Sequence, residues 1–320
     1  MNSPRVLVTS RFLDPGSEID SYLRRSGLEP VFKQCHTEEE MIAAIQGMDA
    51  IICSSDPLSA RVIESANRLK VIARTGVGYN TVDVKAATAR RIPVCTLPGA
   101  NRHAVAEFTF ALMLACGRKL LQNLSVVENG GWKSIDGVEL AGKTLGIVGL
   151  GTIGKEVAQR ARAFEMRLLA YDLVRDEQFA EANGVTYVSL EDLLRQSDFV
   201  TLHCLLDKST HHLIDAERLS LMKPTAILIN AARGGVVDSE ALYRALNENR
   251  IAAAGLDVHE QEPLGDSPLR GLPNVLLTPH AAAATVEYRN RAPFLAADAV
   301  IQALRGERPA HPVNPEVFKE

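Results

Sequence analysis

Short apolar runs rich in β-branched residues alternate with longer stretches in which apolar residues recur every three or four positions. In the first hundred residues the strand-like runs lie at residues 6–9, 50–53 and 71–74. Helical spacing is found at residues 17–26 and 59–66 and again after Asp83. Apolar strands separated by helices are typical of a parallel sheet covered on both faces. This part of the chain therefore predicts an α/β unit.

The same alternation begins again after residue 143. The second set of strand-like runs lies at residues 144–148, 168–171, 199–202, 226–229, 253–256 and 275–277. Residues 100–124, between the two sets, and residues 285–305, near the end, have helical spacing. We therefore predict two doubly wound parallel-sheet domains, with the helix at 100–124 either bridging them or lying in a dimer interface. The Pro-rich tail is expected to pack back on the first domain.

The composition agrees with this picture and narrows the class of partner. The chain has 320 residues, enough for two domains of ordinary size. With 46% hydrophobic and 23% charged residues, it is far from the composition of disordered proteins. The net charge of −4 is spread without blocks of one sign, so there is no electrostatic footprint for nucleic acid or an anionic membrane. A small molecule is the expected partner.

The start of the chain and its cysteines indicate a cytoplasmic protein. The chain begins directly with a strand-like run and lacks the basic and apolar regions of a secretory signal. The longest apolar stretch, residues 104–116, contains Glu107 and is too short to cross a bilayer. The five cysteines are far apart and form no C-x-x-C pair: Cys35, Cys53, Cys95, Cys116 and Cys204. We expect reduced, mostly buried thiols and no metal site.

A glycine-rich turn lies between the strand-like run at 144–148 and a helical stretch. Gly149, Gly151 and Gly154 match the pattern G-x-G-x-x-G. In dinucleotide-binding folds the first glycine permits a tight turn, the second lets the backbone approach a pyrophosphate and the third allows the helix to pack closely. The amides of Thr152 and Ile153 are then expected to point at the phosphates. An isolated glycine triplet often forms only a turn, but its position between strand and helix predicts a dinucleotide site here.

An acidic residue indicates which dinucleotide is bound. Asp172 stands 18 residues after Gly154, at the end of the next strand-like run, where a carboxylate accepts hydrogen bonds from the adenosine ribose. A 2′-phosphate would meet this negative charge, so NAD is favoured over NADP. Arg175 is close enough in sequence to bind a phosphate, which leaves NADP as the alternative.

Three polar residues follow later strand-like runs of the same unit: Arg233, Glu262 and His280. Open α/β sheets bind ligands at the carboxyl ends of their strands, so these side chains are expected to share a crevice with the cofactor. Each also has a structural explanation, respectively an ion pair at a helix start, a turn residue before Pro263 and a satisfied polar group after Pro279. Their joint position favours catalysis.

With the glycine turn and the segment R-T-G-V-G-Y-N at residues 74–80, these segments resemble the D-isomer-specific 2-hydroxyacid dehydrogenases. The closest pattern is that of short D-3-phosphoglycerate dehydrogenases and of hydroxypyruvate or glyoxylate reductases. The resemblance implies an NAD-dependent oxidoreductase that interconverts a D-2-hydroxy acid and its 2-keto acid. It also implies a flavodoxin-like substrate-binding domain, residues 1–99 plus 285–320, a Rossmann NAD-binding domain, residues 100–284, and a homodimer through the latter.

The three polar residues suit this chemistry. Reduction of a 2-keto acid leaves negative charge on the carbonyl oxygen, so a proton donor and a cation are needed there. His280 suits the donor because histidine side chains titrate near neutral pH. Glu262, bonded to its ring, is expected to favour the imidazolium, while Arg233 offers a planar fork that matches the substrate carboxylate.

The resemblance implies further contacts as well as two departures. Substrate would be bound by the backbone of Val77 and Gly78, and cofactor by Cys204, Ala231, Ala232 and Asp257. The chain has Cys53 where many phosphoglycerate-type members have Arg, which weakens the case for phosphate recognition, and Leu205 where a Pro is usual.

Two rival functions remain at this point. The first is an NAD(H)-sensing binding protein, like the transcriptional corepressors that share this fold, and the second is formate or phosphite oxidation with the same cofactor. Of the other histidines, His211 and His212 are interpreted as a surface pair, whereas His103 and His203 are candidates for pocket lining.

Overall fold

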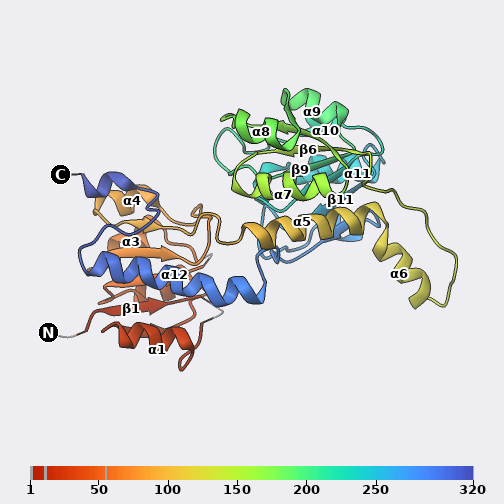
Figure 1. Ribbon diagram of the computed structural model, residues 1–320. Helices are drawn as coiled ribbons and strands as arrows, with labels where there is room; N and C mark the ends of the chain where they lie inside the picture. Colours follow the sequence, from red (N-terminus) through yellow and green to blue (C-terminus); the bar gives the residue numbers. More distant parts are fainter. Residues whose placement is uncertain (1–2, 11–12, 55, 320) are drawn as a thin grey trace. The chain divides into compact units, whose positions relative to one another are not determined.

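The computed structural model describes residues 3–10, 13–54 and 56–319 and divides into two compact units. The first unit comprises Met1–Asn101 and Thr285–Glu320, and the second comprises Arg102–Ala284. Both are α/β units with an entirely parallel sheet (Figure 1). The predicted fold class of two doubly wound parallel-sheet domains is therefore confirmed.

The sheet of the first unit has the strand order β2-β1-β3-β4-β5. Its strands are β1 Arg5–Val8, β2 Glu29–Phe32, β3 Ala50–Cys53, β4 Val71–Arg74 and β5 Val94–Cys95. This is the order of flavodoxin-like doubly wound sheets. The second strand is added on one side of β1, and the strands from β3 onward are added on the other side. Strands β3 and β4 are buried along their whole length, which explains why their sequences are apolar apart from Arg74 at the end of β4.

Helices cover both faces of this sheet. The helices of the unit are α1 Glu18–Arg25, α2 Glu38–Ala44, α3 Ala60–Ser65, α4 Val84–Ala89 and α12 Val286–Leu304. Residues of α1 and α12 pack on the face that carries Val6 and Val8, whereas α2, α3 and α4 pack on the face that carries Leu7. Alternate residues of one strand thus enter two separate cores.

The chain returns to the first sheet after α12, and a 3₁₀ turn, η3 Pro315–Phe318, follows. The Val313 amide donates to Val94 O, and the Val94 amide donates to Asn314 Oδ1. Asn314 is fully buried and also donates to Ile92 O. The Pro-rich tail packs on the first unit at the β5 edge, as expected from the sequence.

The sheet of the second unit has the order β12-β11-β10-β9-β6-β7-β8. Its strands are β6 Thr144–Val148, β7 Arg167–Tyr171, β8 Val185–Tyr187, β9 Phe199–Leu202, β10 Ile227–Asn230, β11 Ala253–Leu256 and β12 Val275–Leu277. Counted from β6, this is the Rossmann order with one further strand, so the direction of growth reverses between β6 and β9. A ligand crevice is expected outside the carboxyl ends of these strands.

Two hydrophobic cores lie on the two faces of the second sheet. Helices α5 Arg102–Gly117, α7 Thr152–Ala163 and α8 Glu177–Asn183 contribute to one core. Helices α9 Leu190–Gln196, α10 Ala216–Leu221 and α11 Ser239–Asn247 contribute to the other. Two 3₁₀ turns, η1 Gly234–Val236 and η2 Pro268–Gly271, complete the unit. No helix among the described residues is both long and apolar enough to span a bilayer.

The single helix predicted at residues 100–124 is wrong, because the chain bends after Gly117. A second helix, α6 Leu120–Glu128, begins beyond Lys119, which has a left-handed φ of 48°. A Cβ on Gly117 would lie 3.3 Å from the ring of Phe199, so glycine lets α5 end close against the sheet. Half of the residues of α5 are buried, whereas α6 has no buried residue.

Candidate active site

The glycine turn after β6 is built as the sequence pattern requires. Gly149 has a φ of +95°, and a Cβ there would lie 2.7 Å from the amide nitrogen of Cys204. A Cβ on Gly154 would overlap the carbonyl oxygen of Gly149, so this glycine allows α7 to pack against the turn. A Cβ on Gly151, by contrast, would meet nothing within 4 Å. The open space over Gly151, at the N-terminus of α7, fits a dinucleotide pyrophosphate.

Asp172 is tied to this turn. It follows β7, and its Oδ2 accepts a hydrogen bond of 2.7 Å from the Leu150 amide, while Oδ1 accepts one of 3.1 Å from the Val174 amide. These bonds hold a carboxylate beside the turn, where the ribose of a bound dinucleotide is expected. The guanidinium of Arg175 lies instead over the ring of Tyr187, 5.2 Å from its centroid.

Asn230 organises the loop that carries Arg233. This buried side chain ends β10, donates to Arg233 O at 3.0 Å and accepts from the Ala232 amide at 3.0 Å. Arg233 is half-buried, and its Nη1 donates to Ala232 O. Sequence reasoning missed Asn230, although an Asn at the end of a strand is a recognised turn signal.

Asp257 supports the loop that carries His280. Its buried carboxylate accepts hydrogen bonds from Thr278 Oγ1 at 2.6 Å, the Ala281 amide at 2.7 Å and the Ala282 amide at 2.8 Å. The His280 amide donates to Asp257 O, and His280 has a left-handed φ of 53°. Asp257 therefore has a supporting role that the sequence did not reveal, whereas its contact with a nicotinamide carboxamide stays a prediction.

His280 and Glu262 form a hydrogen-bonded pair. His280 Nδ1 lies 2.7 Å from Glu262 Oε2, and Glu262 Oε1 accepts a bond of 3.0 Å from the His259 amide. Burial by itself would raise the pKa of the Glu262 carboxyl, but the bonds from His280 and His259 outweigh it and lower the pKa below its ordinary value. Glu262 is therefore ionised at neutral pH, so Nδ1 carries a proton towards it and Nε2 is the ring nitrogen that Glu262 does not engage.

The Arg233 and Glu262 loops touch. A Cβ on Gly234 would overlap the backbone of His259, so glycine is required next to Arg233 for the two loops to pack together. The three predicted catalytic residues thus follow β10, β11 and β12, which are neighbours in one sheet. Their segments meet at the edge where the glycine turn also lies.

The remaining residues predicted to contact the cofactor lie around the turn. Ala231 belongs to a small apolar cluster with Val105 and Ala282, against which Ile153 packs. The Cys204 backbone lies against Gly149, and burial raises the pKa of its thiol to about 11. A neutral, apolar surface of this kind suits a nicotinamide ring.

His203 was a candidate for pocket lining and is half-buried beside this turn. Its Nδ1 is buried without a hydrogen-bond partner in the described part of the chain, and its Nε2 lies 3.0 Å from Thr201 Oγ1. Burial lowers the pKa of His203 to about 3. The ring is therefore neutral and is unsuited to supply a proton at neutral pH.

The predicted substrate segment, with Val77 and Gly78, lies in the first unit, just after β4. The turn that begins this segment is held by bonds from Leu97 N to Gly76 O and from Tyr288 Oη to Thr75 O. Next to it, hydroxyl groups form a row across the carboxyl ends of three adjacent strands. Ser54 Oγ lies 3.0 Å from Ser10 Oγ and 2.9 Å from Thr75 Oγ1. Sequence reasoning missed this row, because its members are far apart along the chain.

Cys53 stands at the position where the sequence departs from phosphoglycerate-type members. The residue is fully buried at the end of β3, and burial raises the pKa of its thiol to about 12. This position therefore offers an uncharged, covered side chain.

Comparison with known proteins agrees with the site. Residues 110–282 match the family model "D-isomer specific 2-hydroxyacid dehydrogenase, NAD binding domain". The chain is 44% identical to a glyoxylate reductase of Korarchaeum cryptofilum over 99% of its own length and 97% of that protein. It is 44% identical to a D-3-phosphoglycerate dehydrogenase of Methanocaldococcus jannaschii over 87% of its length, but covers only 54% of that protein.

Solved structures are similar over the same extent. A glyoxylate reductase from Paecilomyes thermophila aligns with a TM-score of 0.88 at 30% identity, over 99% of this chain and 100% of that one. The TT0316 protein of Thermus thermophilus aligns with a TM-score of 0.88 at 38% identity, over 97% and 99% of the two chains. The chain therefore belongs to the D-isomer-specific 2-hydroxyacid dehydrogenases, a family of NAD-dependent oxidoreductases.

Proposed function

We propose that the protein reduces a small, unphosphorylated 2-keto acid, glyoxylate or hydroxypyruvate, to the corresponding 2-hydroxy acid with NADH. The observation that carries this proposal is the pairing of His280 Nδ1 with Glu262, which leaves Nε2 to act as proton donor. The contact between the Arg233 loop and the Glu262 loop supports a joint role in one site. The product has the D configuration wherever its hydroxyl carbon is chiral.

In this mechanism each residue of the trio has one task. The dinucleotide, when bound at the glycine turn, supplies the hydride. His280 donates the proton from Nε2 to the carbonyl oxygen as negative charge develops there. Glu262 keeps the ring oriented and stabilises the imidazolium, and Arg233 binds the substrate carboxylate through two parallel hydrogen bonds. The backbone of Val77 and Gly78, after β4, is kept as a proposed substrate contact.

The choice of an unphosphorylated acid rests on two observations. Cys53 is buried and uncharged where phosphoglycerate-type members often have Arg, so a phosphate would lack that cation. Relatives named glyoxylate reductases match the chain at 39–44% identity, and a matched D-3-phosphoglycerate dehydrogenase is 44% identical. D-3-phosphoglycerate oxidation is the second candidate because of that relative.

The decisive experiment measures NADH oxidation with glyoxylate, hydroxypyruvate, pyruvate and 3-phosphohydroxypyruvate. We expect the highest kcat/KM for glyoxylate or hydroxypyruvate, with kcat in the usual enzyme range of about 1–1000 per second. Preference for 3-phosphohydroxypyruvate would replace the proposed substrate by the second candidate. A folded protein that binds NADH and turns over none of these acids would contradict the proposed activity and favour the sensing role instead.

We also propose a cytoplasmic homodimer. The dimer is supported by exposed apolar side chains on α6 and just beyond it: Leu120, Leu121, Leu124, Val127 and Trp132, of which Trp132 is 90% exposed. In Figure 1, α6 projects from the body of its own unit, so this apolar surface is available to a second copy. The free thiols of all five cysteines support a reducing compartment.

A further inference from the structure

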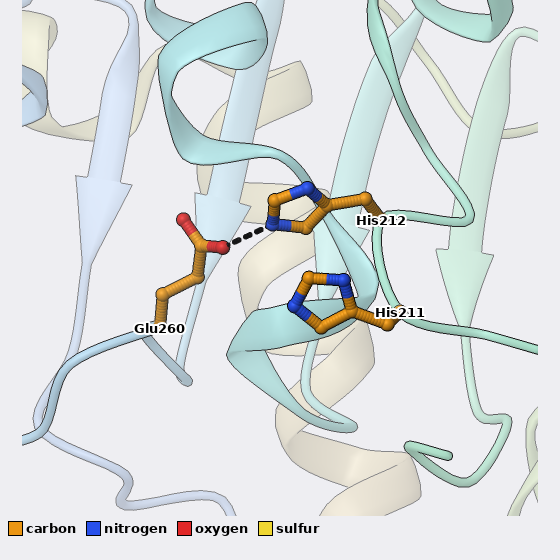
Figure 2. Close-up of side chains that lie close together, drawn as sticks. All are labelled: His211, His212 and Glu260. Carbon is orange, nitrogen blue, oxygen red and sulfur yellow. Dashed lines mark hydrogen bonds and ion pairs between the residues drawn. The ribbon is translucent and has the colours of Figure 1, made fainter. Parts of the chain in front are cut away.

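Two adjacent histidines and a distant glutamate come together beside the active-site loops of the second unit. His211 and His212 follow β9, and Glu260 follows β11. One ligand atom from each residue lies within 4.8 Å of the other two. Figure 2 shows His212 directed at the Glu260 carboxylate and His211 beside it. The sequence interpretation of a simple surface pair did not include Glu260.

The contacts within the cluster bring three metal-binding side chains to one point. His212 Nε2 lies 2.5 Å from Glu260 Oε1, and the two imidazole rings are stacked with centroids 4.0 Å apart. Neighbouring residues of an extended chain point to opposite sides, but His212 has a left-handed φ of 52°. This backbone conformation, uncommon for a residue other than glycine, places both rings on the same side.

Backbone hydrogen bonds fix the loop that carries the histidines. The His211 amide donates to Asp207 O at 2.9 Å, and the His212 amide donates to Gly235 O at 2.8 Å. The Ser209 amide and hydroxyl both donate to Asp207 Oδ1. The two imidazoles are therefore presented by an ordered turn that is attached to the loop after β10.

Glu260 is held in a similar way. Its second carboxylate oxygen, Oε2, accepts a bond of 3.2 Å from the Ser239 amide. The residue also lines a cavity of about 240 Å³. Second contacts of this kind orient a carboxylate that binds a metal ion.

We propose that His211, His212 and Glu260 bind a divalent first-row transition-metal ion, with Zn²⁺ as the reference ion. Two imidazoles and one carboxylate are a common three-ligand set for Zn²⁺, with water in the fourth position. Ligand atoms about 2.1 Å from a tetrahedral ion lie roughly 3.4 Å from one another, so the site closes when the side chains rotate and the two rings leave their stacked arrangement. Imidazole ligands disfavour Mg²⁺ and Ca²⁺, which require oxygen.

The bound ion joins two loops that follow different strands. His211 and His212 belong to the loop after β9, whereas Glu260 belongs to the loop after β11 that leads to Glu262. An ion held by both therefore stabilises the folded second unit by mass action. This consequence depends on binding alone and not on the proposed reaction.

The experiment measures Zn²⁺ binding to the full chain by competition with a chromogenic chelator, and thermal unfolding with and without Zn²⁺. We expect one bound ion per chain and a rise in Tm. His211→Ala and Glu260→Gln should each weaken affinity at least about tenfold and reduce the rise in Tm. His36→Ala, which removes an exposed histidine beside Cys35 in the first unit, is the matched control and should bind like the wild type.

Further measurements make the assignment specific. Co²⁺ bound to the wild type should give visible absorption bands, and these bands should be lost in His211→Ala. Added Mg²⁺ should not displace the bound Co²⁺. Because His211 is exposed, its removal is not expected to unfold the protein. Zn²⁺ binding that is unchanged in both His211→Ala and Glu260→Gln, or that is lost in His36→Ala, would overturn the proposal. So would a wild-type affinity no higher than that of His211→Ala.

Discussion

At the scale of single residues, the site depends on which nitrogen of His280 is engaged. Nδ1 is paired with Glu262 at 2.7 Å, and Glu262 is in turn held by the His259 amide. A carboxylate on Nδ1 fixes the ring tautomer and stabilises the imidazolium, so the proposed mechanism treats the two residues as one acid–base unit. Removal of either partner has a distinct kinetic signature.

The pH dependence of the reaction tests this pair. Reduction requires the protonated ring, so it should fall as pH rises, whereas oxidation of the hydroxy acid should rise over the same range. Since the pKa of Glu262 is lowered, its own titration lies below this range. Glu262→Gln removes the charge that stabilises the imidazolium and should move both midpoints to lower pH.

His280→Ala tests how much His280 contributes to kcat. It should lower kcat by roughly 100-fold or more and abolish the pH-dependent step. Both variants are measured as pH profiles of kcat in the two directions. A midpoint that stays in place or moves upward in Glu262→Gln would contradict the pairing, even if His280 remained essential.

Arg233 is tested by a substitution that keeps its charge. Arg233→Lys retains a cation but loses the planar fork that matches a carboxylate, so kcat/KM for keto acids should fall strongly. NADH affinity should change little, because that residue is assigned to the substrate. Steady-state kinetics and NADH titration separate the two effects. An unchanged kcat/KM would exclude Arg233 from the site.

At the scale of elements, the β6–turn–α7 segment shows that three glycines of one motif have different physical roles. Gly149 and Gly154 are required by the fold itself, because a Cβ at either would crowd or overlap the backbone. Gly151 is surrounded by open space and is required only if a ligand fills that space. Substitution of Gly151 therefore tests ligand binding, whereas substitution of Gly154 tests the fold.

Two alanine substitutions use this difference. Gly151→Ala should lower stability only modestly, by about 1 kcal/mol, since its φ of −75° suits any residue but alanine is a poorer N-cap than glycine. It should nevertheless weaken NADH binding, because its Cβ occupies the pyrophosphate space. Gly154→Ala should lower stability, by about 1–3 kcal/mol, the usual range for overpacking. Normal NADH binding by Gly151→Ala, measured by fluorescence titration, would place the pyrophosphate elsewhere.

Asp172 connects the glycine turn to β7 and is expected to select the cofactor. Asp172→Ala removes the carboxylate that accepts hydrogen bonds from the ribose, so NADH binding should weaken. It also removes the charge that repels the 2′-phosphate of NADPH, so the preference for NADH over NADPH should become smaller. Asp172→Asn keeps an acceptor for the Leu150 amide and isolates the effect of charge. Dissociation constants for both cofactors are compared. An equal loss of affinity for NADH and NADPH in both variants would mean that this carboxylate does not discriminate.

At the scale of the whole molecule, the chain forms two units, each with a doubly wound parallel sheet. It leaves the first unit after residue 101 and returns to it at residue 285. The second unit also carries α6, which buries none of its own residues within the chain. An exposed apolar helix of this kind is costly in water unless a partner covers it. The proposed dimer accounts for this feature.

The dimer is tested by placing a charge on α6. Wild-type protein at micromolar concentration should scatter light as twice the chain mass of 34.8 kDa, and Leu124→Glu should shift it towards the monomer. Val286→Glu is the control, because Val286 is an equally apolar and highly exposed helical residue of the first unit. A monomeric wild type, or a dimer that Leu124→Glu does not weaken, would contradict an interface through α6.

The sequence by itself determined most of the elements and the position of the dinucleotide turn. Apolar periodicity and glycine spacing are local properties, and they predicted the strands from β6 to β12 other than β8. Helix α12 and the role of Gly149 and Gly154 were also predicted correctly. The end of α5 was not, because the bend at Gly117 depends on contact with Phe199 in a distant strand.

Only the tertiary structure decided which polar groups meet. His280 pairs with Glu262, Asp257 holds the loop of His280, and Glu260 reaches His212 across 48 residues of sequence. The sequence placed the trio at strand ends but said nothing of Asn230 or of the hydroxyl row in the first unit. The physical reason is that a parallel sheet brings the carboxyl ends of successive strands to one edge. Helices of varying length separate those strands, so no local spacing encodes which loop side chains will lie within hydrogen-bonding distance.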